Sequence, residues 1–273
     1  MAAKLLCGLI GAGIQQSLTP AMQEEEARQQ GLRLHYQLID VSGDVLPGLI
    51  GAARMMRFDG LNITYPYKQA VMSLLDALSE EADAIGAVNT VVREGERLIG
   101  HNTDGAGWSW GFRRALPDAD ISRVVLLGAG GAGSACADAV LRLGAGEVRV
   151  FDQDISRSRA LCARLGKRAV VAETLPEALR DATGLIQATP VGMAKHPGLP
   201  VSEALLKPAL WISEVVYVPL ETELLKAARR IGCRTVDGGH MNVGQAVRGF
   251  KLFTGRDADP ARMEAHFRSL AGR

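Results

Sequence analysis

Cysteine, excess charge and long apolar runs are all scarce in this chain of 273 residues, and each scarcity excludes a class of protein. The four cysteines form no Cys-x-x-Cys pair, so neither a disulfide framework nor a structural zinc site is expected. The 31 basic residues are balanced by 30 acidic ones, and the net charge of +1 argues against a nucleic-acid partner. No apolar run reaches the roughly 18 residues that a membrane-spanning helix requires. The five histidines show no metal-ligand spacing, so no metal is expected.

The first residues contain one lysine and a short apolar stretch, as a secretory signal peptide does. Residues 5–10 are better interpreted as a buried first strand, because a glycine-rich turn follows them and no cleavage-site sequence does. Apolar residues make up 47% of the chain and charged residues 22%, which are ordinary proportions for a packed globular protein. We therefore expect a cytoplasmic enzyme that acts on a small molecule, as a monomer or a homodimer.

Strand and helix patterns alternate along the chain and restart near its middle, which predicts two α/β domains with a boundary near residues 105–110. The first half is expected to contain strands at 5–10, 33–40 and 60–64, helices at 19–30, 46–57 and 68–78, and a hairpin of 87–93 with 97–100. The second half is expected to contain strands at 123–127, 147–151, 168–171, 184–188, 210–216 and 233–237, a helix ending at 143 and a final helix over 242–253. Thr19 and Pro20 begin the helix at 19–30, where a hydroxyl can cap and a proline fits.

A glycine-rich run follows the strand at 123–127 directly and contains Gly128, Gly130, Gly131, Ala132 and Gly133. Such a run alone is a weak signal, but here a strand precedes it, a helix follows it, and Asp152 ends the next strand 24 residues after Gly128. These are the requirements of a dinucleotide-binding site. Gly128 would make the turn, Gly130 would let backbone approach the pyrophosphate, and Gly133 would let the helix pack on the strand. The start of the helix would attract the phosphates.

A carboxylate at Asp152 favours NAD over NADP, because it can accept hydrogen bonds from the adenosine ribose and repels a 2′-phosphate. Asp154 adds a second negative charge nearby. Arg157 and Arg159 follow, and either could still reach a phosphate; alternatively both lie on a solvated helix face, or Arg157 stacks on adenine. We predict NAD as the cofactor and keep NADP as the less favoured alternative.

Lys68 and Asp104 each stand just past an apolar run, in the segments 60–68 and 102–105. A lysine and an aspartate of this kind can form the acid–base pair of a carbonyl–alcohol interconversion. Lysines near loops are more often solvated surface charges, and an aspartate in Asn-Thr-Asp-Gly can be a simple turn residue. The pairing is a hypothesis that depends on the motifs around it.

Seven segments, taken in order, strongly resemble the shikimate dehydrogenase family: 17–20, 62–68, 86–90, 102–105, the glycine-rich run, 188–193 and 245–246. Asp152 and the runs 100–104 and 221–225 make the chain most similar to the NAD-dependent quinate/shikimate dehydrogenases within that family. The resemblance implies an α/β substrate-binding domain over 1–104, completed by C-terminal helices at 241–273. It also implies a Rossmann domain with a parallel sheet over 105–240. Connections near Gly105–Gly107 and Gly238–Gly239 would serve as hinges.

The family's chemistry would be oxidation of the 3-hydroxyl of quinate or shikimate to 3-dehydroquinate or 3-dehydroshikimate, with Lys68 and Asp104 as the catalytic pair. The implied substrate-binding residues are Ser17, Thr19, Asn62, Thr64, Asn89, Tyr217 and Gln245. The implied cofactor-binding residues are Gly128, Gly130, Gly131, Ala132, Gly133, Asp152, Arg157, Thr189, Pro190, Val191, Met193, Val215, Gly238 and Met241. Ser17 and Thr19 would hold the substrate carboxylate at a helix start, although both can also serve as helix caps. Met241 can equally be a core residue, and Asn89 a turn residue.

Three positions depart from the family pattern: Gln16 replaces a common histidine, Thr19 replaces a serine, and Tyr65 fills a slot that is often valine or histidine. These changes affect which ring acid fits, so the substrate stays open between quinate, shikimate and a close analogue. Alternative hypotheses are a biosynthetic NADP-linked shikimate dehydrogenase, a catalytically idle ligand-binding regulator, and the related methylene-tetrahydrofolate dehydrogenase architecture.

Overall fold

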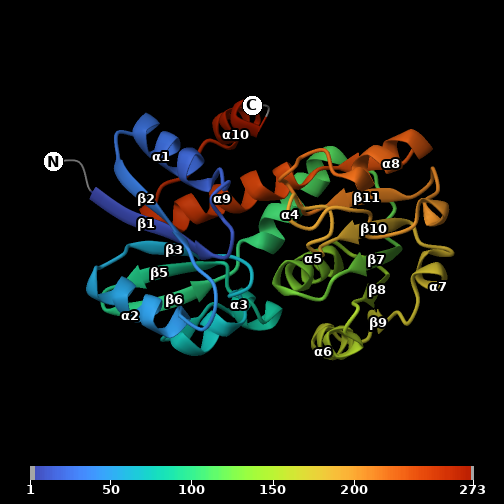
Figure 1. Cartoon of the computed structure of the whole chain (residues 1–273), viewed down its shortest axis with the longest axis horizontal. Coiled ribbons are helices and arrows are strands. Elements are labelled where there is room, and N and C mark those ends of the chain that lie inside the picture. The colour runs from blue at the N-terminus through green and yellow to red at the C-terminus, as the bar shows by residue number, and fades with distance from the viewer. Residues whose placement is uncertain (1–3, 272–273) are drawn as a thin grey trace. The chain divides into compact units, whose positions relative to one another are not determined.

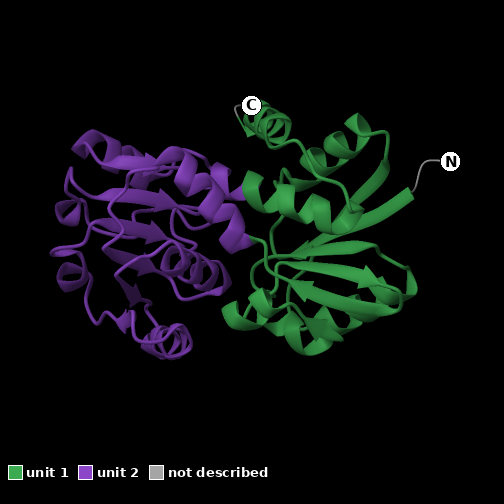
Figure 2. Ribbon diagram, turned by 180° about the vertical axis from the view of Figure 1, so that it is seen from behind, with its two compact units in different colours: residues 1–103, 243–273 green, residues 104–242 purple. Residues whose placement is uncertain are grey.

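The computed structural model describes residues 4–271, which form two compact units (Figure 2). Unit 1 contains the chain up to Thr103 and again from Val243 onward, and unit 2 contains Asp104–Asn242. Each unit is built on its own six-stranded sheet. The prediction of two α/β domains, the second with a Rossmann-type parallel sheet, is confirmed.

The sheet of unit 1 has the strand order β2-β1-β3-β5-β6-β4, in which only β5 runs antiparallel to its neighbours (Figure 1). Its strands are β1 (Lys4–Gly11), β2 (Arg33–Asp40), β3 (Gly60–Ile63), β4 (Ala77–Leu78), β5 (Thr90–Glu94) and β6 (Arg97–His101). Its helices are α1 (Thr19–Gln29), α2 (Leu46–Met55), α3 (Glu80–Ile85) and α10 (Pro260–Ala271), together with the part of α9 (Gly238–Thr254) from Val243 onward. A 3₁₀ helix, η1, spans Ala70–Leu74.

Alternate residues of the unit 1 strands enter two separate apolar cores, because successive side chains of a strand point to opposite faces. On one face Ile10, Leu61 and Ile63 pack with Ile50 of α2. On the other, Cys7 and Leu9 pack with Phe253 near the end of α9. Burial of the Cys7 thiol raises its pKa to about 12, so this cysteine behaves as an apolar core residue.

The sheet of unit 2 is entirely parallel and has the strand order β12-β11-β10-β7-β8-β9 (Figure 1). Its strands are β7 (Arg123–Leu127), β8 (Glu147–Phe151), β9 (Ala169–Val171), β10 (Gly184–Gln187), β11 (Trp211–Glu214) and β12 (Arg234–Val236). Its helices are α4 (Asp104–Ala115), α5 (Gly131–Arg142), α6 (Ile155–Leu165), α7 (Leu175–Leu179), α8 (Glu223–Ile231) and the first turn of α9, with a 3₁₀ helix, η2, at Glu203–Leu205. The order reverses between β7 and β10, which is where this fold class binds its ligands.

The two faces of this sheet are covered by different helices. Val124 and Leu126 of β7 pack with Trp108 of α4 and residues of α5, whereas Val125 and Leu127 enter the opposite core with residues of α7 and α8. Continuous apolar runs such as β7 are typical of parallel strands buried on both faces. Among the described residues, no helix is both long and apolar enough to cross a membrane.

The helix predicted over 68–78 is wrong. Only η1 is helical there, and Ala77–Leu78 form a short strand that pairs in parallel with β6. Asp76 holds this strand in place, since its carboxylate accepts a 2.6 Å bond from the Leu98 N–H and its own N–H donates to the Leu98 carbonyl. The helix α3, which was not predicted, comes next, with Ser79 as its N-cap.

Two further local expectations are wrong. Thr19 does not cap α1; Leu18 is the N-cap residue, and no side-chain hydrogen bond closes that end of the helix. Gly105–Gly107 is not a loop connection but the first turn of α4, and Gly238–Gly239 likewise begins α9; the expectation that these segments serve as hinges stays a prediction, since hinges also occur at the ends of helices. Gly105 lies close against α5, because an added Cβ would be 3.1 Å from the Ala135 carbonyl oxygen.

Candidate functional site

Most of the predicted catalytic and substrate-binding residues of unit 1 stand next to the strand ends at one edge of its sheet. Ser17 and Thr19 follow the end of β1, Thr64 and Lys68 follow the end of β3, and Asn89 precedes β5. The antiparallel direction of β5 brings its first residue, Thr90, opposite both Asn62 and His101. The ends of β1, β3 and β6 and the start of β5 therefore meet at this edge.

Two hydroxyls lie together at the start of α1. The Ser17 hydroxyl donates to the Thr19 hydroxyl at 3.2 Å and accepts from the Thr19 N–H at 3.3 Å. Thr19 is almost fully buried, and the Ser17 N–H is fixed by the Ile14 carbonyl. The first N–H groups of a helix have no partner within the helix, so this pair of hydroxyls stands beside a local positive field.

The turn that carries Lys68 is pinned at both of its ends. The Thr64 N–H donates to the Ile10 carbonyl at 2.9 Å, and the Val88 N–H donates to the Lys68 carbonyl at 2.8 Å. Between them, the buried Tyr67 hydroxyl donates to the Gly43 carbonyl at 3.0 Å. The backbone of Lys68 is thus held in place, while its side chain is half-buried at the edge of the sheet.

A buried amide–hydroxyl network supports the same edge from beneath. The Asn62 side chain donates to the Asn89 carbonyl and the Thr90 hydroxyl, and its oxygen accepts a 2.6 Å bond from the Tyr36 hydroxyl. The Asn89 oxygen accepts from the Thr103 N–H at 2.8 Å, and its amide donates to the Thr103 hydroxyl. Both amide hydrogens of Asn62 are therefore occupied inside unit 1, which makes it a residue that positions Asn89.

Thr103 ends unit 1, and the next residue, Asp104, is the first residue of both α4 and unit 2. Only 4% of Asp104 is exposed. Gln245 lies half-buried on α9, and the neighbouring Ala246 carbonyl accepts a bond from the Gln23 side chain on α1. The bond network at Asn89 and Thr103 thus fixes the backbone immediately before Asp104.

The glycine-rich run has the geometry expected of a dinucleotide loop. Gly128 has a φ of +93°, and a Cβ there would meet the Ala188 carbonyl at 2.9 Å. A Cβ at Gly133 would lie 1.9 Å from the Gly128 carbonyl, so the helix can pack on the strand only with glycine at this position. Gly130 is the N-cap of α5, and a Cβ added to it would meet no atom within 4 Å, so the space beside it is open. The space at Gly130 and the N–H groups of Gly131, Ala132 and Gly133 fit a pyrophosphate.

Asp152 is tied to this loop. One of its carboxylate oxygens accepts a 2.8 Å bond from the Ala129 N–H, and the other accepts from the Asp154 N–H at 2.9 Å. Asp154 caps α6 through the Ser156 N–H and lies 3.6 Å from the Arg157 guanidinium. Two carboxylates therefore stand at the end of β8, and the nearby arginine is paired with one of them.

Two loops that carry predicted cofactor residues follow β10 and β11. Thr189, Pro190, Val191 and Met193 belong to the first, and Val215 begins the second, which also contains Tyr217. A Cβ at Gly238 would lie 2.4 Å from the Val215 carbonyl oxygen, so the start of α9 is in close contact with the second loop. Met241 is buried in the core shared by α4 and α5, which agrees with the alternative interpretation of this residue as core.

Sequence reasoning missed several residues that organise these loops. Gln187 and Glu214 are the last residues of β10 and β11, are 0% and 1% exposed, and bond to the loops beyond them. Tyr36 and Thr103 support the unit 1 edge. The signal for these four residues in the sequence was weak. Gln187, Glu214 and Thr103 are polar residues at or beside the end of an apolar strand, and Tyr36 lies inside a strand.

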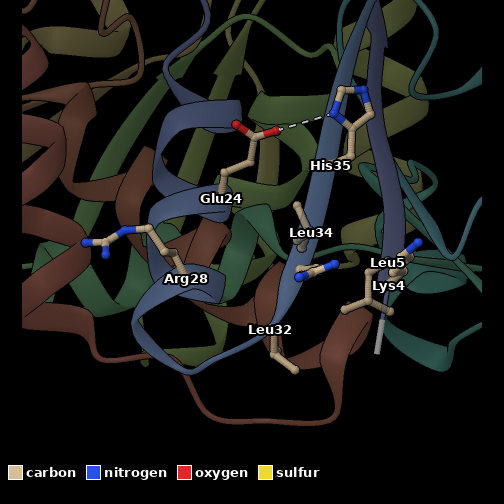
Figure 3. A pocket seen from close by; sticks show the side chains of 8 residues that line it. Lys4, Leu5, Glu24, Arg28, Leu32, Leu34 and His35 are labelled. Carbon is tan, nitrogen blue, oxygen red and sulfur yellow. Dashed lines mark ion pairs between the residues drawn. The ribbon is translucent and has the colours of Figure 1, made fainter. Parts of the chain in front are cut away.

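A hollow of about 490 Å³ lies elsewhere in unit 1, beside α1 and the first residues of β1 and β2 (Figure 3). Lys4, Arg28 and Arg33 line it, and His35 faces Glu24 at 3.9 Å. None of the predicted site residues lines it, and it is open to solvent. Across residues 4–271 no group of three or more His, Cys, Asp or Glu side chains is arranged to hold a metal ion.

The sequence and the fold of this chain are similar to those of known proteins. The family described as the shikimate dehydrogenase substrate binding domain matches residues 9–91. The chain is 55% identical over 279 residues to the shikimate dehydrogenase (NADP⁺) of Streptomyces avermitilis, covering 98% of this chain and 96% of that protein. It is 47% identical over 279 residues to the quinate/shikimate dehydrogenase (NAD⁺) of Corynebacterium efficiens, covering 97% and 98%. The solved structure of quinate dehydrogenase from Corynebacterium glutamicum in complex with NAD matches with a TM-score of 0.90 at 43% identity, covering 98% of this chain and 100% of that one.

Proposed function

The chain belongs to the shikimate dehydrogenase family, and we propose that it is an NAD-dependent dehydrogenase that reversibly oxidises the 3-hydroxyl of quinate or shikimate. The observation that carries the proposal is the single edge of the unit 1 sheet that collects Ser17, Thr19, Thr64, Lys68 and Asn89. These side chains offer an anion site, ring-hydroxyl partners and a proton acceptor, which a hydroxylated ring acid requires together.

In the proposed mechanism Lys68 removes the proton of the reacting hydroxyl, and Asp104 orients the lysine and that hydroxyl. Ser17 and Thr19 bind the ring carboxylate, with the N–H groups at the start of α1 adding a favourable dipole. Thr64 and Asn89 hold ring hydroxyls, and Tyr217 and Gln245 are proposed as further residues that bind the ring acid. Asn62 acts indirectly, by fixing Asn89. The bound dinucleotide supplies the hydride acceptor.

We propose NAD as the dinucleotide because Asp152 directly follows β8, where a carboxylate would suit the free ribose hydroxyls of NAD and would repel the 2′-phosphate of NADP, and Asp154 adds a second negative charge nearby. Arg157, the first cation after these two residues in the chain, lies 3.6 Å from Asp154 and is paired with it. The pyrophosphate would lie on the N–H groups of Gly131, Ala132 and Gly133. Thr189, Pro190, Val191, Met193, Val215, Gly238 and Met241 are proposed for the nicotinamide half.

One observation favours a second candidate, a shikimate dehydrogenase that uses NADP. The Streptomyces avermitilis relative, at 55% identity, carries NADP⁺ in its name, whereas the Corynebacterium relatives carry NAD⁺. Cofactor preference therefore decides between the two.

The test is a set of initial rates for quinate and shikimate oxidation, each with NAD and with NADP. Lys68→Met should lower kcat by about 10²–10⁴-fold, the range of general base catalysis, while changing the KM for the ring acid little. Lys167→Met, which alters an exposed lysine of unit 2, is the matched control and should leave the rates unchanged. Wild-type turnover that persists in Lys68→Met would refute the base assignment. Dinucleotide binding without turnover of either acid would favour a ligand-binding regulator instead.

A further inference from the structure

Two buried polar side chains stand next to one another in the unit 2 sheet, and neither has a place in the proposed mechanism. Gln187 ends β10 and Glu214 ends β11, and the two are register partners across these parallel strands. They are 0% and 1% exposed. A buried amide and a buried carboxylate are costly unless their hydrogen bonds are made, so their partners indicate what they do.

Gln187 closes the loop that comes after its own strand. Its amide nitrogen donates to the Thr189 carbonyl at 3.1 Å and to the Val191 carbonyl at 2.7 Å. Its oxygen accepts from the Thr189 N–H at 2.9 Å. The Thr189 hydroxyl in turn accepts from the Val191 N–H at 3.2 Å. One side chain therefore determines which way the peptide groups of this loop face.

Glu214 does the same for the loop after β11. One carboxylate oxygen accepts from the Val216 N–H at 2.9 Å, and the other accepts from the Thr222 hydroxyl at 3.0 Å. Thr222 is also the N-cap of α8, because its hydroxyl accepts from the Leu225 N–H at 3.3 Å. The carboxylate thus ties both ends of the segment that carries Val215 and Tyr217.

The two loops contact each other above this pair. A Cβ added at Gly192 would lie 3.6 Å from the Thr222 side chain and 3.9 Å from a carboxylate oxygen of Glu214. The Ala194 N–H donates to the Val218 carbonyl at 3.3 Å. The loops after β10 and β11 are therefore one connected structure resting on Gln187, Glu214 and Thr222.

We propose that Gln187 and Glu214 are positioning residues that shape the nicotinamide half of the dinucleotide site, Glu214 acting together with Thr222. Gln187 acts through Thr189 and Val191. Glu214 acts through Val215 and Tyr217, which the proposed function assigns to the cofactor and to the ring acid. The inference rests on the proposed function, because it assigns roles within that same site.

The test uses the full-length chain and two near-isosteric variants. Gln187→Glu removes both amide donors and leaves two loop carbonyls facing a carboxylate, and Thr222→Val removes the hydroxyl that Glu214 holds. Binding of NAD, and of NADP in a parallel titration, is measured by calorimetry without ring acid. KM and kcat are then measured for both substrates. Glu223→Gln, at an exposed residue on the first turn of α8, is the matched control, and Thr222→Ser should restore what Thr222→Val loses.

Gln187→Glu should weaken cofactor binding by about tenfold or more, as loss of a buried hydrogen bond does, and leave the ring-acid KM within twofold at saturating cofactor. Thr222→Val should raise both the cofactor and the ring-acid KM, since its loop carries Tyr217. Melting temperatures above the assay temperature show that the variants are folded. Unchanged cofactor affinity in both variants, or Thr222→Ser as weak as Thr222→Val, would overturn the inference while leaving the proposed function standing. A wild type that binds neither dinucleotide would instead overturn the proposed function itself.

Discussion

At the scale of single residues, the structure separates side chains that face a ligand from those that hold them in place. Asn62 illustrates the difference, because a motif match suggests a ligand contact while its three hydrogen bonds lie within unit 1. The glycines of the loop after β7 were predictable, because a strand before them, a helix after them and Asp152 after the next strand form a pattern that is visible in the sequence. Gln187 and Glu214 were not, because a polar residue at a strand end looks the same in sequence whether it is exposed or buried.

Asp152 gives the sharpest residue-scale prediction about the cofactor. Asp152→Ser should lower kcat/KM with NAD by about tenfold, because the loss of one hydrogen bond to the ribose has an effect of about that size. It should also raise the NADP-to-NAD ratio of kcat/KM, because the repulsion of a 2′-phosphate is removed. Asp154→Asn is the comparison: it keeps the cap of α6 and loses only the second negative charge, so it should raise the ratio less than Asp152→Ser does. The role of Asp152 is contradicted if both variants change the ratio equally. Initial rates with both dinucleotides measure the effect.

Glu214 also predicts a pH dependence of stability. Burial raises the pKa of this carboxyl from 4.5 to about 7, although bonds from Val216 and Thr222 oppose the shift. The folded state therefore holds a proton that the unfolded state releases between these two pH values, and stability falls as pH rises through that window. Because each unit of pKa shift corresponds to about 1.4 kcal/mol, the shift of Glu214 limits this loss of unfolding free energy to about 3 kcal/mol.

Glu214→Gln should lack this pH-dependent loss, so the difference in unfolding free energy between wild type and variant should shrink or reverse from pH 5 to pH 8. Urea unfolding followed by tryptophan fluorescence suits the measurement, because Trp108, Trp110 and Trp211 all lie in unit 2. A difference that is constant with pH would show that Glu214 does not titrate in this range.

At the scale of secondary-structure elements, the strands were predicted best. The bounds of β2, β7 and β8 agree with the sequence, because an alternating pattern or a continuous apolar run ends in each case at polar or glycine residues. The helix expected over 68–78 failed for a non-local reason: Asp76 and β6 hold Ala77–Leu78 extended, and nothing within the segment itself indicates that pairing. The prediction for Lys68 does not depend on that helix, because the position of Lys68 follows from the turn after β3 and not from the conformation of residues 70–78.

The attachment of α10 to α1 provides a prediction at this scale. Arg262 of α10 donates two bonds to the fully buried carboxylate of Glu26 on α1, at 2.6 and 2.7 Å. Arg262→Met would leave that buried charge without its partner, which typically costs about 3 kcal/mol. Chemical denaturation monitored by far-UV circular dichroism should show the loss.

Arg268→Met serves as the comparison, because Arg268 lies on the same helix and its pair with Glu264 is 3.9 Å long. It should change stability by well under about 1 kcal/mol. Adding Glu26→Gln to Arg262→Met should recover part of the loss, since the uncompensated charge is then removed. Equal destabilisation by the two arginine variants would mean that packing of α10, and not the buried pair, anchors this helix.

At the scale of the whole molecule, unit 1 is discontinuous in sequence. Phe250 and Phe253 of α9 are buried in unit 1, and an added Cβ at Gly60 would lie 2.1 Å from the Phe253 ring. The first 103 residues therefore cannot fill their core without the returning helix, whereas unit 2 is continuous from Asp104 to Asn242.

A chain ended after Asn242 should consequently keep unit 2 folded and lose unit 1. Limited proteolysis with mass spectrometry should then cleave within residues 4–103 and spare 104–242. A chain ended after Thr254 keeps α9 and is the control; it should protect both units, with weaker protection of unit 1. Protection of residues 4–103 in the shorter chain would show that unit 1 folds without α9.

The same discontinuity sets an order of events on the ribosome. All of unit 2 leaves the exit tunnel before the last residues of α9 do, so a complete Rossmann unit can form while the earlier sheet still lacks that helix. Until then the apolar faces of β1 and β3 that later receive Phe253 remain open to solvent, to chaperones and to other nascent chains. The strands made first are thus among the last to reach their final packing.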